Sequence, residues 1–148
     1  MAFTVTSSAF NDGDSLPKQF TCDGDNVPPP LTWSGAPDGT RSFALIMDDP
    51  DAPNGTFTHW VLYDIPARTT QWPTEAGGKT LLNSFGRSGY GGPCPPPSHG
   101  PHRYVFTLHA IKVRFLELTG ERLEDLQTAL GALTLATARL MMRYERAR

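Results

Sequence analysis

The sequence predicts a mainly β protein, a sandwich of two antiparallel sheets with a C-terminal helical segment packed at its edge. Short segments of strand character occupy most of the 148-residue chain, and clusters of glycine and proline separate them. A helical pattern of apolar residues begins only after Gly120. Short strands first and a helix last are typical of such a sandwich.

The first strands are predicted from their apolar patterns, taken in chain order. Residues 3–6 alternate apolar and polar side chains, and residues 31–34 follow a run of prolines. Residues 42–47 are almost continuously apolar, which suits a central strand that is buried on both faces. Turn-forming residues at 11–15 and 35–40 separate these segments.

Two longer strands are predicted further along the chain. Residues 57–65 are rich in aromatic and β-branched residues, and residues 103–112 alternate through Tyr104, Phe106, Leu108 and Ala110. Residues 66–101 show little regular pattern, and so long an irregular stretch in a compact domain favours a functional loop region.

The C-terminal segment is predicted to be helical. Leucines and other apolar residues recur there at intervals of three, four and seven, which is the period of a helix with one buried face; they are Leu126, Leu130, Leu133, Leu140, Met141 and Tyr144. Gly131 should split the helix in two. The arginines at positions 139, 143 and 146 would form a solvated face near its C-terminal end.

The length and composition favour one domain over residues 1–148, located in the cytoplasm. No apolar run approaches the roughly 20 residues that span a bilayer, and residues 1–10 lack the features of a signal peptide. The net charge of −2 offers no general attraction for nucleic acid or anionic lipid. Cys22 and Cys94 are too few for a disulfide framework, so we expect buried thiols, although a bridge between them stays open.

Two segments concentrate the residues that can do chemistry. Asp48, Asp49 and Asp51 lie in a proline-interrupted run that leads to His59, and the second segment covers residues 95–104. Each lies at the end of a predicted strand. Because prolines are stiff and donate no backbone hydrogen bond, they suit the wall of a small pocket.

Strand alternation separates binding from supporting residues in the second segment. His102 and Tyr104 should share one face of the strand, whereas Arg103 should point to the other face and pair with Asp51 behind the pocket wall. Histidines beside carboxylates can donate charge-assisted hydrogen bonds to an anion. Asp49 would repel that anion unless it is protonated or turned to orient a histidine. His109 is expected to be an ordinary core histidine.

These motifs resemble the phosphatidylethanolamine-binding proteins, in particular the bacterial, Raf kinase inhibitor-like branch. The resemblance runs in order from about Phe3 to Arg146 and is carried by FTCDG at 20–24, WSG at 33–35, DDPDAP at 48–53, HWVLY at 59–63, GYGGPCPP at 89–96 and GPHRYVF at 100–106. Two positions depart from the family pattern. Ser98 stands where a glycine is usual. Ala132 follows Gly131, and in the family a histidine commonly stands at this position.

The resemblance implies a pocket that binds phosphate or phosphorylated head groups, such as those of phosphatidylethanolamine, a nucleotide or another phosphoester. The residues predicted to bind the ligand are Asp49, Pro53, His59, Pro95, Pro96, Gly100, His102 and Tyr104, with Asp51 and Arg103 as structural support. It also implies a homodimer and, as a further role, regulation of a partner protein such as a kinase. No cofactor is predicted.

An enzyme and a metal-binding protein are the alternatives. The aspartates and histidines could serve as acid and base in a hydrolase, but Gly86–Tyr90 fails the Gly-x-Ser-x-Gly pattern of a nucleophile elbow at its last position. His59, His99 and His102 could bind zinc, but His99 and His102 lie three residues apart in a proline-broken loop rather than on a helix. We therefore predict neither catalytic residues nor a metal site.

Overall fold

The structure, a computed structural model, describes residues 2–74 and 77–146 and contains two antiparallel sheets and one α-helix. The smaller sheet has the order β1-β2-β5 and is formed by Thr4–Thr6, Leu31–Ser34 and Gln71–Trp72. The larger sheet has the order β6-β4-β3-β7-β8 and is formed by Lys79–Thr80, Phe57–Pro66, Ser42–Asp49, His102–Ile111 and Thr134–Tyr144. A 3₁₀ turn covers Lys18–Phe20, and helix α1 covers Leu123–Leu133. The predicted fold class is confirmed.

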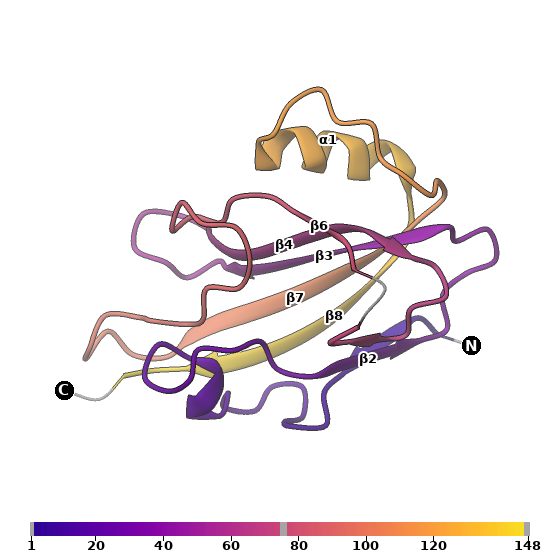
Figure 1. The fold of residues 1–148 in the computed structure, drawn as a ribbon. Coiled ribbons are helices and arrows are strands. Elements are labelled where there is room, and N and C mark those ends of the chain that lie inside the picture. Colours follow the sequence, from indigo (N-terminus) through magenta and orange to yellow (C-terminus); the bar gives the residue numbers. More distant parts are fainter. Residues whose placement is uncertain (1, 75–76, 147–148) are drawn as a thin grey trace.

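The layers follow from which side chains each strand buries. Figure 1 shows the smaller sheet on one side of the larger sheet and α1 on the other. The main core lies between the sheets, where Trp33 of β2 packs with Phe43 of β3 and Phe106 of β7. A second core lies under α1, where Leu126 and Leu130 join residues on the outer face of the larger sheet. Strand β3 is therefore buried on both faces, as its apolar sequence predicts.

The second half of the predicted C-terminal helix is instead strand β8, so this part of the prediction is wrong. Residues 134–144 pair with β7 along almost the full length of both strands. Leu140 and Met142 face the main core, whereas Met141 between them is only partly buried. Arg139 and Arg143 share the outer face of this strand and do not lie on a helix. The spacing of Leu140 and Tyr144 fits both periods, and the ladder with β7 decides between them.

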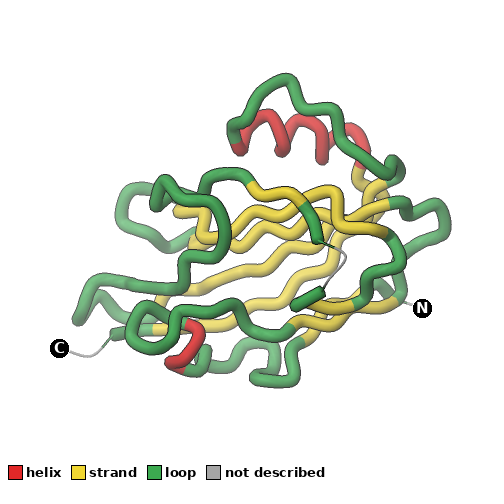
Figure 2. Tube along the Cα trace, in the orientation of Figure 1, coloured by secondary structure: helices red, strands yellow, loops and turns green. Residues whose placement is uncertain are grey.

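Long loops, green in Figure 2, connect the strands at the end of the larger sheet where β3 stops and β4 and β7 begin. In its described part, the irregular stretch predicted over residues 66–101 contains the last residue of β4, Pro66, and the short strands β5 and β6. Within the described ranges, no helix has the length and apolar character needed to cross a membrane.

A strand and a helix over residues 134–144 would bury different side chains, so substitutions there distinguish the two by their effect on stability. We expect Leu140→Ala to cost about 2–5 kcal/mol of unfolding free energy, because Leu140 is only 2% exposed. Met141→Ala should cost much less, since its side chain faces outward from β8. Chemical denaturation of both variants measures the difference. Similar large costs would instead favour a helix that buries both side chains.

Candidate functional site

A cavity of about 130 Å³ opens where the ends of β3, β4 and β7 meet the loops. Its lining contains Asp49, Ala52, Pro53, Phe57, His59, Phe85, Cys94, Pro95, Pro96, His102 and Tyr104. All of the residues predicted to bind the ligand are among them except Gly100. Sequence reasoning missed Ala52, Phe57, Phe85 and Cys94. Phe57 had been assigned to a strand, and Phe85 lies in the irregular stretch, where no periodicity indicates the direction of a side chain.

Strand pairing explains why residues so far apart in sequence meet. Asp49 ends β3, and β3 lies between β4 and β7 with both neighbours antiparallel to it. The C-terminal end of β3 therefore lies beside the N-terminal ends of its two neighbours. Those ends carry His59 on one side and His102 on the other.

Asp49 is turned to orient a histidine, which is one of the two arrangements that the sequence left open. Its Oδ2 lies 2.7 Å from Nδ1 of His102, and its Oδ1 accepts a 2.8 Å hydrogen bond from the backbone N–H of Asp51. Asp49 and His102 are 3% and 2% exposed. Because the carboxylate accepts, Nδ1 of His102 carries the proton, and both carboxylate oxygens are engaged within the protein.

His102 is also engaged at its second nitrogen. Its Nε2 lies 2.7 Å from Nδ1 of His99, so Asp49, His102 and His99 form a hydrogen-bonded chain that runs from the buried end of β3 to the surface. His99 had been considered only as a metal ligand. A turn brings it back over His102, with positive φ angles of 65° at Ser98 and 82° at Gly100. A glycine at position 98 would adopt that angle more easily, and Ser98 adopts it all the same.

His59 presents a neutral imidazole to the cavity. Its Nδ1 donates a 2.6 Å hydrogen bond to the carbonyl of Gly91, which leaves Nε2 as the free nitrogen. Burial lowers the pKa of His59 below its ordinary value, although Asp49 and the bond to Gly91 act in the opposite direction. The rings of Phe57, Phe85 and Tyr104 lie 4.9, 5.5 and 5.3 Å from the imidazole centroid.

Tyr104 supplies a hydroxyl group to the same cavity. Burial and the nearby carboxylates Asp49 and Asp51 raise its pKa, so the hydroxyl stays protonated and can donate a hydrogen bond. Within residues 2–74 and 77–146, no protein group accepts from it. The hydroxyl therefore remains available to a bound molecule.

Arg103 and Asp51 pair as the alternation of β7 predicts, but on the surface. Both the backbone N–H and the guanidinium of Arg103 donate to Asp51, at 2.9 Å in each of three bonds. These bonds lower the pKa of Asp51 to about 2. The two side chains are 54% and 32% exposed, so the pair is not a buried support, and removal of one partner should cost little stability.

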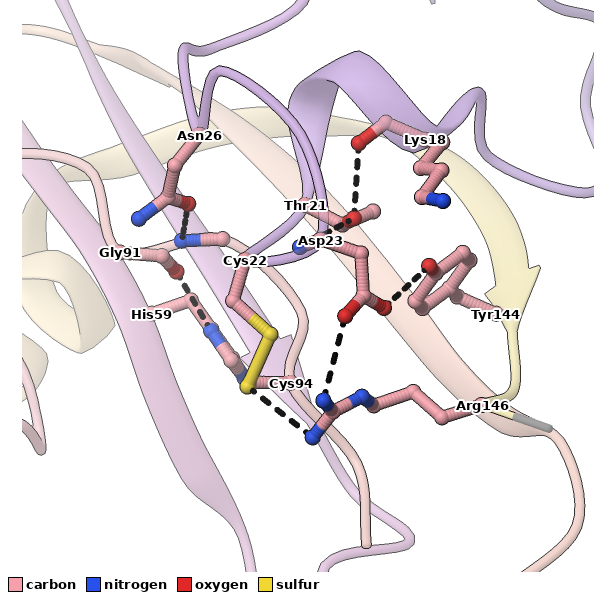
Figure 3. The surroundings of a disulfide bond; sticks show 11 residues. Lys18, Thr21, Cys22, Asp23, Asn26, His59, Gly91, Cys94, Tyr144 and Arg146 are labelled. Carbon is pink, nitrogen blue, oxygen red and sulfur yellow. Dashed lines mark hydrogen bonds and ion pairs between the residues drawn. A yellow bond between two sulfur atoms is a disulfide. The ribbon is translucent and has the colours of Figure 1, made fainter. Parts of the chain in front are cut away.

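The two cysteines form a disulfide, so the expectation of buried thiols is wrong. Figure 3 shows Cys22 joined to Cys94. Cys94 directly precedes Pro95 and Pro96 and lines the cavity with them. Hydrogen bonds reinforce the junction: Cys22 N–H donates to the carbonyl of Pro93 at 3.1 Å, and Gly92 N–H donates to Asn26 Oδ1 at 2.8 Å. The bridge spans 72 residues in sequence, and no spacing motif in the sequence reveals such a pairing.

His109, expected to be a core histidine without polar neighbours, is only partly buried and lies 3.2 Å from the hydroxyl of Thr134. It lies away from the cavity described above. As for the metal alternative, the described part of the chain holds no group of three or more histidine, cysteine or acidic residues arranged to bind an ion.

Comparison with known proteins gives one consistent result. The family model for phosphatidylethanolamine-binding protein matches residues 6–145. A UPF0098 protein of Aquifex aeolicus is 47% identical over 150 residues, which cover 96% of this chain and 88% of that protein. The crystal structure of Escherichia coli YbcL, described as a new member of the mammalian PEBP family, superposes with a TM-score of 0.89 at 35% identity and covers 98% of this chain and 99% of that one. Carboxypeptidase Y inhibitor, at 22% identity and a TM-score of 0.59 over 97% of this chain and 82% of its own, shares the fold alone.

Proposed function

The chain belongs to the phosphatidylethanolamine-binding protein family, and from that premise we propose that it is a binding protein whose cavity takes a phosphate-type head group. The observation that supports this most is the free hydroxyl of Tyr104 beside the free Nε2 of His59 in a cavity of about 130 Å³. Sites for whole drug-sized molecules hold roughly 300–1,000 Å³. This cavity therefore suits a head group, with the rest of the molecule outside.

The two free groups suit a phosphoester. The hydroxyl of Tyr104 donates to a phosphate oxygen. Neutral His59 accepts from a ligand hydroxyl, and protonated His59 donates to a second phosphate oxygen. Asp49 does not compete as a free acceptor, because both of its oxygens already accept hydrogen bonds. The same chemistry serves a phospholipid head group and a free phosphoester, and it includes no nucleophile for hydrolysis.

Anion binding should strengthen as pH falls, because His59 gains a proton. Burial lowers the pKa of His59, so the charged form becomes populated only below the ordinary value near 6.5. A suitable probe is glycerophosphoethanolamine, because a phosphodiester keeps one negative charge across this range. Calorimetry at pH 5 and pH 8 should show tighter binding at pH 5, and His59→Asn, which keeps a donor for Gly91, should flatten the dependence.

Tyr104→Phe should weaken binding of the same probe by about ten- to a hundredfold, the contribution of one hydrogen bond to a charged group. Tyr63→Phe, on the opposite face of the larger sheet, is the matched control and should bind normally. Inorganic phosphate as a second probe distinguishes free phosphate from a head group. Affinity that is independent of both pH and Tyr104 would rule out the proposed anion pocket.

The disulfide leads us to propose an oxidising compartment in place of the cytoplasmic location expected from the sequence. Disulfides persist outside the reducing cytosol, and exposed Cys94 would meet cytosolic reductants directly. We expect both cysteines to resist alkylation in intact cells and to react only after reduction and unfolding. Labelling of both without added reductant would place the protein in a reducing compartment.

A homodimer also remains a proposal, supported by the family resemblance and by exposed apolar side chains such as Phe115 and Leu135. Light scattering at micromolar concentration should give twice the chain mass of 16.2 kDa. A mass of one chain would remove the proposal. Regulation of a partner protein such as a kinase, through the mouth of the cavity, also remains a proposal that rests on the family resemblance.

A further inference from the structure

A second cavity, of about 480 Å³, lies on the opposite face of the larger sheet, between α1 and strands β3, β7 and β8. It is lined by Ile46, Asp48, Thr107, His109, Gln127, Leu130, Gly131, Thr134, Thr137 and Arg139. It shares no residue with the first cavity. Asp48 and Asp49 point to opposite faces of β3, so each cavity receives one of these neighbouring carboxylates.

This cavity exists because α1 covers only part of the sheet. Leu126 and Leu130 pack on Ala44 and Ile46, but the neighbouring faces of β7 and β8 carry polar side chains. Gly131 leaves the wall on the helix side open, since a Cβ atom there would meet nothing within 4 Å. The volume lies within the range typical of small-molecule sites, which the first cavity does not reach.

One end of the cavity suits a carboxylate. Arg139 lies opposite Thr107, and two positions along the ladder, on the same face, His109 lies opposite Thr137. Burial and the charge of Arg139 lower the pKa of His109, so its imidazole is neutral and adds a polar group without a second charge. In the part of the chain that the structure describes, the guanidinium of Arg139 has no carboxylate partner. Its planar fork of N–H donors matches the geometry of a carboxylate, and the hydroxyls of Thr107 and Thr137 lie on the same face.

The other end suits a hydrogen-bond donor. Asp48 is partly buried, and its Oδ1 accepts a 2.8 Å hydrogen bond from the hydroxyl of Thr58. Burial raises its pKa. No described side chain donates to its second oxygen, Oδ2. An ammonium or hydroxyl group of a ligand would supply that bond.

The pairing of the strands gives the distance between the two ends. Ile46 of β3 lies opposite Thr107 of β7, which in turn lies opposite Arg139 of β8. Asp48 follows Ile46 by two residues on β3, so it is separated from Arg139 by two strand spacings across the sheet and two residues along it. With strands about 4.8 Å apart and about 3.4 Å per residue, the two backbone positions are roughly 12 Å apart. Ile46 and Leu130 provide an apolar surface between these ends.

We propose that this cavity is a second binding site, for a small carboxylate that carries an ammonium or hydroxyl group at the far end of a short aliphatic chain. The carboxylate binds Arg139, the donor binds Asp48, and the chain lies on Ile46 and Leu130. The site is independent of the head-group cavity on the opposite face.

The test uses 6-aminohexanoate as the probe, followed by NMR through the side chains of Gln127 and His109. We expect saturable shifts in the low-millimolar range, as befits so small a ligand. Hexanoate, which lacks the donor, and hexylamine, which lacks the carboxylate, should each bind more weakly. Asp48→Asn, which keeps an acceptor for Thr58, should reduce the advantage of 6-aminohexanoate over hexanoate.

Two matched pairs of variants localise the binding. Arg139→Gln should weaken it at least about tenfold, whereas Arg143→Gln, on the same face of β8 but outside the cavity, should not. Gly131→Leu should block the cavity, whereas Ala132→Leu, at the next and exposed position of α1 outside the cavity lining, should leave binding intact. Equal responses to all three probes, or indifference to Arg139, would overturn the proposal. Shifts of the same signals with protein concentration alone would also overturn it and assign the face to a second copy of the chain.

Discussion

The register of β3 is the constraint on which both cavities depend. This strand pairs with β4 on one side and β7 on the other and is buried on both faces. Its last two residues are the adjacent carboxylates Asp48 and Asp49, which alternate to opposite faces. A slip of one residue would exchange the two faces, so the apolar side chains packed in one core would enter the other core and each carboxylate would reach the opposite cavity. The packing of the cores therefore fixes which carboxylate reaches which cavity.

The chain from Asp49 through His102 to His99 changes the role expected for His102. Both nitrogens of this imidazole are engaged within the protein, so it serves as a positioning residue for the cavity wall rather than as a free donor. Loss of His102 would leave the buried carboxylate of Asp49 without its main partner, which is costly in a protein interior. Tyr104 and His59 keep free polar atoms and are the groups that can contact a ligand.

Local pattern was sufficient for most of the fold and for much of the candidate site. Alternation along residues 103–112 placed Tyr104 and Arg103 on opposite faces, and the motifs around Asp49 and His59 predicted the cavity lining. The local sequence pattern gave wrong predictions where contacts between residues far apart in sequence determine the structure. The ladder with β7 makes residues 134–144 a strand, and the fold alone brings Cys22 to Cys94. Phe57 shares one face of β4 with His59, two residues along the strand, whereas Phe85 and His99 join the site through loop geometry, which no periodicity encodes.

The electrostatics of the first cavity favour a ligand with one negative charge over a ligand with two. Among the residues that the structure describes, neither lysine nor arginine lines it, and neutral His59 adds no cation until the pH falls below its lowered pKa. Asp49 remains a source of negative potential even with both oxygens hydrogen-bonded, and its repulsion grows with the charge of the ligand in so buried a place. A monoanionic phosphodiester meets half the repulsion of a dianionic monoester, while both can accept the hydrogen bond of Tyr104. If the proposed function holds, a phosphodiester should therefore bind this cavity more tightly than a phosphate dianion.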